Sequence, residues 1–209
     1  KIIDLKLDNE ILTINFSKEF LTVNETNEEP MLEALIYSLT ELKEIKKIKI
    51  LVENIPFTKL PNSNKKLPEY LDKTYGINKI YNLNSLKETS KTTIYYLSKI
   101  NDYYYYVPVT KVSNEKLERV EIIIKELKST PIYHTNLISY LKASANMTNY
   151  ELLENAISLS FNNYLIANMK EEQILEEVKY SIALSLRDTY GINEVIFNIP
   201  DSENSKISI

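Results

Sequence analysis

LEALIYSL, at residues 32–39, leads into KILVENIP at residues 49–56, and this pair of segments decides the fold because it occurs twice. The second copy reads LEEVKYSI at residues 175–182 and leads into NEVIFNIP at residues 193–200. The two copies align with a single-residue insertion near Thr189-Tyr190-Gly191. A helical pattern that twice precedes an apolar strand and an Asn-Ile-Pro end predicts two related modules.

Length and composition limit the class of protein. The 209 residues suit two domains of about 80–120 residues each. A hydrophobic content of 44% with 26% charged residues is typical of a globular protein, and no run of 18 apolar residues occurs. A net charge of -4 argues against a nucleic-acid surface. The absence of Cys removes disulfides, thiolate chemistry and most zinc sites.

The first module is expected at residues 1–60. Alternating apolar residues predict a hairpin over residues 1–16, with a turn at Asp8-Asn9-Glu10. Thr26 and Glu29 have capping-box spacing for the helix that follows. Residues 47–52 read as a strand. Because the chain starts at Lys1 rather than Met, we expect a processed form or a fragment, with any signal peptide or lipid-attachment Cys upstream.

A turn-rich linker is expected at residues 61–90, and a fuller second module at residues 91–200. Two hairpins are predicted there, the first with its turn at Asn101-Asp102 and the second over residues 141–161, and each is followed by a helix. Ser113 would cap the first helix, and Asn168 with Glu171 the second. The last strand spans residues 194–199, and residues 201–209 form a frayed tail.

The order of these elements predicts an α+β fold. Each of the two related small modules would hold a mixed or antiparallel sheet with helices packed on one face. The first module shows only the later half of the order seen in the second. It would therefore be truncated, or completed by residues outside this sequence.

The sequence offers no constellation of catalytic, metal-binding or cofactor-binding residues. His134 is the only histidine, and it follows a predicted helix in a loop. The carboxylate pairs Glu28-Glu29, Glu171-Glu172 and Glu176-Glu177 lie in predicted helices or their first turns, where negative charge is favoured without any catalytic role. Two glycines about 115 residues apart cannot form a phosphate-cradling loop. We therefore predict that the protein is not an enzyme and needs no cofactor or metal.

The run Tyr103-Tyr104-Tyr105-Tyr106 is the most unusual local feature. In a strand, two of the four side chains face the core and two face outward. One interpretation is a hairpin with an aromatic cross-strand ladder, and the other is a partner-binding surface, since exposed Tyr is enriched at interfaces. The candidate contacts are Tyr103 with Tyr105, or Tyr104 with Tyr106, depending on which face is outward.

These residues resemble a known family. TIYYL at residues 93–97, YYYVPVT at residues 104–110, a capped helix, a hairpin, and a helix leading to the final Asn-Ile-Pro are similar to the GerM sporulation and germination domain. The resemblance covers residues 90–200 as one domain and residues 1–60 as the later part of another, a layout similar to tandem GerM domains. The chain departs from the family in lacking the first domain's opening hairpin and helix, and in its few glycines.

The resemblance implies ring-building-like α+β modules and a structural or scaffold role in the channel assembly between mother cell and forespore. It also implies a membrane-anchored lipoprotein in the intermembrane space, held by an anchor outside this sequence, with stage II sporulation protein Q as a protein partner and no nucleic acid. The family carries no known active site. Two alternatives stay open: a module that binds cell-wall glycans or another small ligand through its tyrosines, and a wall hydrolase built around His134 or a buried Glu.

Overall fold

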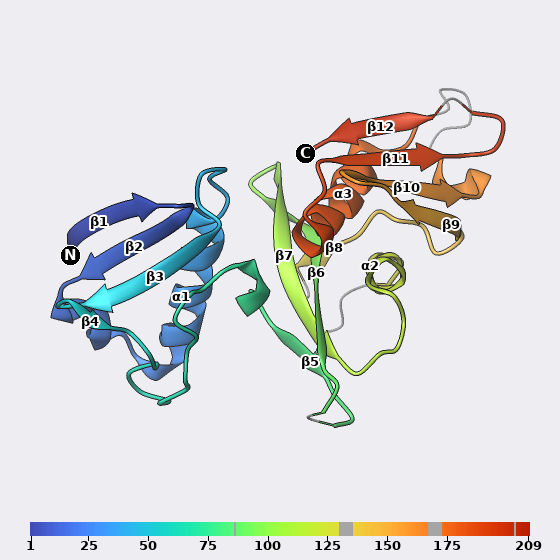
Figure 1. The fold of residues 1–209 in the computed structure, drawn as a ribbon. Coiled ribbons are helices and arrows are strands. Elements are labelled where there is room, and N and C mark those ends of the chain that lie inside the picture. Colours follow the sequence, from blue (N-terminus) through green and yellow to red (C-terminus); the bar gives the residue numbers. More distant parts are fainter. Residues whose placement is uncertain (86, 130–135, 167–172, 203) are drawn as a thin grey trace. The chain divides into compact units, whose positions relative to one another are not determined.

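The computed structural model describes residues 1–85, 87–129, 136–166, 173–202 and 204–209. The chain divides into two compact units, Lys1–Asn78 and Lys79–Ile209 (Figure 1). Each unit has its own buried hydrophobic core. The expected α+β class with two related modules is confirmed.

The first unit is a four-stranded sheet covered by one α-helix. Its elements are β1 (Ile2–Asp8), β2 (Ile11–Phe16), the 3-10 helix η1 (Lys18–Thr22), α1 (Glu25–Leu39), β3 (Lys47–Val52), β4 (Ile55–Pro56) and the 3-10 helix η2 (Lys73–Tyr75). The strand order is β1-β2-β3-β4, with β2 and β3 parallel across the α1 crossover. Leu32 and Ile36 of α1 are fully buried against Ile14, Ile48 and Ile50 of the sheet.

The second unit contains two four-stranded sheets. One has the order β5-β7-β6-β8 and consists of β5 (Ile80–Asn82), β6 (Ser90–Ile100), β7 (Tyr103–Ser113) and β8 (Leu137–Ile138). The other has the order β12-β11-β10-β9 and consists of β9 (Met147–Leu152), β10 (Ala156–Phe161), β11 (Glu194–Asn198) and β12 (Ser205–Ser208). The helices are α2 (Arg119–Leu127), η3 (Asn163–Leu165) and α3 (Glu176–Tyr190).

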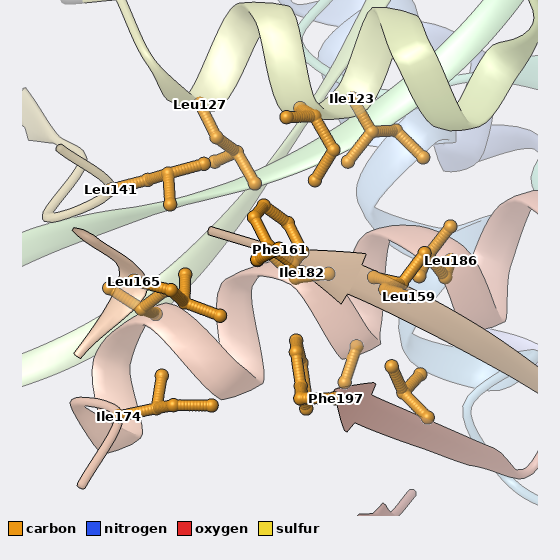
Figure 2. Close-up of a cluster of buried hydrophobic side chains, with 14 of the residues drawn as sticks. Ile123, Leu127, Leu141, Leu159, Phe161, Leu165, Ile174, Ile182, Leu186 and Phe197 are labelled. Carbon is orange, nitrogen blue, oxygen red and sulfur yellow. The ribbon is translucent and has the colours of Figure 1, made fainter. Parts of the chain in front are cut away.

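One core joins these elements of the second unit. Ile123 and Leu127 of α2 point toward Phe161 of β10, and Ile182 and Leu186 of α3 lie on the same side of the sheet (Figure 2). The parallel pair β10–β11, linked through α3, repeats the β2–α1–β3 arrangement of the first unit. Helices therefore pack on one face of this sheet, as the sequence predicts.

The repeat extends to single residues in the hairpins β1–β2 and β9–β10. Ile2 pairs with Phe16 and Met147 pairs with Phe161. Each residue of the first hairpin therefore corresponds to the residue 145 positions later in the second hairpin. A β-bulge follows this pair in both hairpins. After the second strand, Ser17 N donates to Lys1 O at 2.9 Å, and Asn162 N donates to Asn146 O at 3.0 Å. The duplication is therefore closest in the part of the module that precedes the helix.

The Asn-Ile-Pro ends of the two copies, by contrast, are not structurally equivalent. Asn54 has a φ of 65° in the turn between β3 and β4, whereas Asn198 is still in β11. The backbone hydrogen bonds make Lys47 the counterpart of Glu194. Lys47 N donates to Glu10 O, and Glu194 N donates to Asn155 O, where Asn155 is the counterpart of Glu10. The sequence match instead aligns Ile50 with Glu194, three residues away. A shift of a strand alignment by an odd number of residues turns every side chain to the opposite face of the sheet. The predicted alignment of the two Asn-Ile-Pro ends is therefore wrong.

The shared segment Thr-Tyr-Gly-Ile-Asn ends two different kinds of helix. Gly191 follows α3 in the left-handed region, with φ 70° and ψ 24°, and its N–H donates to Arg187 O at 2.7 Å. This is the predicted glycine helix end. Gly76 follows the short helix η2 with φ 88° and ψ 164°, which is a different backbone conformation.

Two predicted boundaries are wrong. The proposed linker at residues 61–90 contributes Leu67 and Leu71 to the core of the first unit, and its later part forms β5, which pairs with β7. The segment begins with polar, turn-forming residues, and this composition led to the wrong prediction that it lies outside the core. The proposed frayed tail at residues 201–209 contains β12, which pairs with β11 and buries Ile207.

Several predicted helix starts are also displaced. Asn24, rather than Thr26, caps α1 by accepting from Asn27 N at 2.9 Å. Glu118, rather than Ser113, caps α2, because β7 continues to Ser113. The proposed caps Asn168 and Glu171 lie outside the described residues, and α3 begins later, at Glu176. The first strand of the second hairpin is β9 rather than residues 141–145.

Glu28 of α1 fixes the segment that follows β4. Its carboxylate accepts hydrogen bonds from Asn62 N at 2.8 Å, Asn62 Nδ2 at 3.0 Å and Ser63 N at 3.0 Å. Burial opposes ionisation, but the hydrogen bonds from Ser63 and Asn62 outweigh it and lower the pKa of Glu28 to about 2. The ionised carboxylate therefore stabilises the fold.

This arrangement predicts an acid-sensitive first unit. Because the folded pKa lies below the ordinary value of 4.5, the stabilisation is complete above about pH 4.5 and is lost as the pH falls toward 2. Urea denaturation between pH 5 and pH 2.5 should show a steeper loss of stability for the wild type than for Glu28→Gln. Glu25→Gln, which removes an exposed carboxylate from the same helix, is the control. Equal pH slopes for the wild type and Glu28→Gln would contradict the prediction.

Candidate protein-interaction surface

The β6–β7 hairpin is the longest strand pair of the second unit (Figure 1), and its tip carries exposed tyrosines. We define the hairpin tip as residues 98–106. Asn101 and Asp102 have φ values of 48° and 66°, so they form the predicted two-residue turn. Tyr103 is 70% exposed, Tyr105 51% and Tyr104 43%. Exposed apolar surface of this kind is typical of binding sites.

The register assigns these side chains to two faces. Tyr103 lies opposite Ile100, and Tyr105 lies opposite Ser98, so the four residues share one face. Ile100 is also exposed, so this face presents two tyrosines and an isoleucine to solvent. Of the two predicted pairs, Tyr103 with Tyr105 is thus the outward one.

Tyr104 on the other face is held by neighbours. Its hydroxyl lies 2.9 Å from the Tyr140 hydroxyl, and the two rings meet edge to face with centroids 6.2 Å apart. Lys99 Nζ lies 6.0 Å from the centroid of the Tyr104 ring and pairs with Asp102 at 3.1 Å. Tyr140 also remains partly exposed. Sequence reasoning missed Tyr140, because it follows β8 in an irregular segment and no periodic pattern connects it to the hairpin.

Tyr106 is part of the packing rather than of the free surface. Its ring centroid lies 5.9 Å from that of Tyr180 on α3. Burial, together with the nearby carboxylate of Glu177, raises the pKa of Tyr106 to about 12. Tyr106 therefore stays protonated at physiological pH and anchors the hairpin to α3.

The other candidates do not assemble into a catalytic or metal site in the described part of the chain. Glu28 binds backbone and side-chain amides, Glu29 pairs with Lys65, and Glu176 pairs with Lys179. His134 and the pair Glu171-Glu172 lie outside the described residues. Over the described ranges, no group of three or more His, Asp or Glu side chains could hold a metal ion. Nor does any described helix have the length and apolarity needed to span a membrane.

The chain is similar to known proteins in its sequence and in its fold. The family model Germane, described as sporulation and spore germination, matches residues 1–58. These residues are therefore similar to a Germane domain. The chain is also 26% identical over 198 residues to the spore germination protein GerM of Bacillus subtilis (strain 168), a match that covers 92% of this chain. The chain spans about half, 54%, of that relative's length.

The same relative provides the structural comparison. The solved tandem GerMN domains of GerM from Bacillus subtilis match 97% of this chain with a TM-score of 0.87, at 22% sequence identity and over 72% of that chain. The chain therefore has the fold of tandem GerMN domains. The resemblance to tandem GerM domains drawn from the sequence is confirmed.

Proposed function

We propose that the chain is a non-enzymatic sporulation or germination protein that acts as a structural component of the assembly linking mother cell and forespore. The relative's name and the family description support the sporulation role. The proposal includes an extracytoplasmic, membrane-anchored location in the space between the two cells. It also includes protein–protein contact as the mode of action, with stage II sporulation protein Q as the candidate partner.

The exposed face of the hairpin tip is the observation that carries the contact proposal. Tyr103, Tyr105 and Ile100 form an apolar patch at the end of two eleven-residue strands. Aromatic side chains lose little conformational entropy on binding for the area they bury, and they are enriched among residues that dominate interface energetics. Tyr104, Tyr140 and Lys99 would form the rim of this interface.

Replacing the outward pair should weaken the complex without unfolding the protein. The double variant Tyr103→Ser/Tyr105→Ser removes exposed rings only, so its melting temperature should stay within a few degrees of the wild type. Its dissociation constant for the ectodomain of stage II sporulation protein Q from the same organism should rise by about tenfold to a hundredfold. Sizing chromatography with light scattering shows whether the complex forms. Calorimetric titration measures its dissociation constant for the wild type and for the double variant.

Tyr164→Ser is the matched control, because Tyr164 is also highly exposed but lies on η3, away from the hairpin in sequence. It should leave binding unchanged. Equal binding by the double variant and the wild type would remove the hairpin tip from the interface. The absence of any complex between well-folded proteins would refute this partner.

Glycan binding through the same tyrosines is the competing proposal. The rings of Tyr104 and Tyr140 lie at 77° to one another, so they do not form one flat platform for a sugar ring. Titration with muropeptide fragments separates the two proposals. A raised melting temperature that the Tyr103→Ser/Tyr105→Ser variant abolishes would favour the glycan role over the protein contact.

A further inference from the structure

A cluster of tyrosines lies on the reverse of the outward face of the hairpin tip. Tyr104 and Tyr106 are two residues apart in β7, so they share this face. The ring of Tyr104 lies 6.2 Å from that of Tyr140, centroid to centroid. The ring of Tyr106 lies 5.9 Å from that of Tyr180 on α3. Four phenol rings therefore gather at one place, and three of them are exposed to solvent.

The carboxylate of Glu177 lies beside these rings. Glu177 and Tyr180 are three residues apart in α3, and this spacing puts both side chains on one face of the helix. Burial raises the pKa of Tyr106, and the hydrogen bond between the two hydroxyls raises that of Tyr140. In both cases the nearby negative charge of Glu177 adds to the effect. The carboxylate therefore acts on both pairs of rings.

Within the part of the chain that the structure describes, no cation pairs with this carboxylate. Glu177 is half-buried. Lys179, two residues later in α3, pairs with Glu176 instead. Lys99, the cation at the hairpin tip, pairs with Asp102. Among the described residues, a half-buried carboxylate beside exposed aromatic rings is thus left without a counter-ion.

The first unit shows what such a pair of groups binds. At three places within residues 1–78, a Lys ammonium both lies over a Tyr ring and pairs with a Glu carboxylate. The distances from Nζ to the ring centroid are 5.5 Å, 5.7 Å and 5.8 Å. The ring attracts the cation through its quadrupole, and the carboxylate attracts it through its charge. The three sets are Lys49 with Tyr70 and Glu69, Lys65 with Tyr75 and Glu29, and Lys73 with Tyr37 and Glu41.

We propose that this cluster, the tyrosine–glutamate site, binds a basic side chain, Lys or Arg, that a partner protein presents. The site consists of Tyr104, Tyr106, Tyr140, Tyr180 and Glu177. It offers the two groups that hold each ammonium in the first unit, so charge complementarity selects a basic segment over an acidic or neutral one. The site shares two rim tyrosines with the interface proposed above, but it does not depend on that function.

Two short peptides test the proposal on the full chain. Acetyl-Gly-Arg-Gly-amide carries the cation, and the same peptide with citrulline in place of Arg carries a neutral side chain of almost the same shape. With the Arg peptide, the ring resonances of Tyr140 and Tyr180 should shift and saturate with a dissociation constant of about 1–10 mM. The citrulline peptide should cause no saturable shift. Glu177→Gln should weaken binding of the Arg peptide by about fivefold to tenfold, because it removes the charged partner.

Glu154→Gln is the matched control, since it removes the same charge from the exposed turn between β9 and β10. It should change the affinity by less than about twofold. Tyr180→Phe keeps an aromatic face and should bind the Arg peptide like the wild type, whereas Tyr180→Leu should weaken binding by about threefold or more. Melting temperatures close to that of the wild type show that each variant is folded.

Equal shifts with the Arg and citrulline peptides would overturn the proposal, and so would shifts that stay linear up to about 50 mM peptide. Equal weakening by Glu177→Gln and Glu154→Gln would also overturn it, because the attraction would then come from the overall charge. The Tyr103→Ser/Tyr105→Ser variant should bind the Arg peptide as the wild type does. Failure of this proposal is therefore seen separately from failure of the contact proposed for the outward face.

Discussion

Phe161→Ala should lower the free energy of unfolding of the second unit by about 3–5 kcal/mol. Phe161 is 1% exposed and lies on β10 beneath Ile123 and Leu127 of α2 (Figure 2). Truncation would leave a cavity between helix and sheet that several rigid neighbours border, so collapse around it would be incomplete. Urea denaturation followed by far-UV circular dichroism measures the loss.

Tyr164→Ala is the control for this prediction, because it removes an aromatic ring three residues away that is 62% exposed. It should change the free energy of unfolding by no more than about 0.5 kcal/mol. Phe161→Leu should cost about 1.5 kcal/mol or less, because most of the side-chain volume remains. If Phe161→Ala were no more harmful than Tyr164→Ala, the core would be assigned wrongly.

Lys111→Met should destabilise the second unit by about 3 kcal/mol. Lys111 is buried on β7, where its ammonium pairs with Glu115 and, at 2.7 Å, with Glu126 of α2. Burial disfavours the charged form, but the hydrogen bonds that the ammonium donates to these two carboxylates outweigh it and raise the pKa of Lys111. Removal of the cation would leave Glu126 half-buried without this partner, while Glu115 keeps Lys125 at 2.8 Å.

The double variant Lys111→Met/Glu126→Gln separates the cost of losing the ammonium from the cost of leaving the Glu126 carboxylate without this partner. Neutralising the carboxylate removes its unpaired charge, so the double variant should recover at least about 1 kcal/mol relative to Lys111→Met. Chemical denaturation of the wild type, both single variants and the double variant completes the cycle. Simple addition of the two single losses would show that the contact between β7 and α2 does not depend on this ion pair.

Strand pattern and turn chemistry predicted most of the elements correctly. Strict alternation gave the β1–β2 and β6–β7 hairpins, and Asn101-Asp102 gave the turn between β6 and β7. Helix caps were harder to predict, because several polar residues compete near each start and tertiary context selects one. Long-range packing was hardest. Leu67 and Leu71 lie in a segment with linker-like composition, and only the folded unit shows their burial.

The candidate surface could be predicted in part. The run of four tyrosines identified the hairpin tip, and alternation limited the outward set to two pairs. The choice between these pairs depends on α3, because Tyr180 packs on Tyr106. The exposed face of β1 was not predicted, since Leu5 and Leu7 alternate like ordinary inward-facing residues.

Site-specific photo-crosslinking in sporulating cells tests the proposed protein contact most directly. A benzophenone side chain at position 103 should form a covalent adduct with a component of the assembly between mother cell and forespore, and the same group at position 164 should form none. Mass spectrometry of the adduct identifies the partner. Labelling that is equal at both positions, or that at position 103 captures cell-wall glycan rather than protein, would contradict the account.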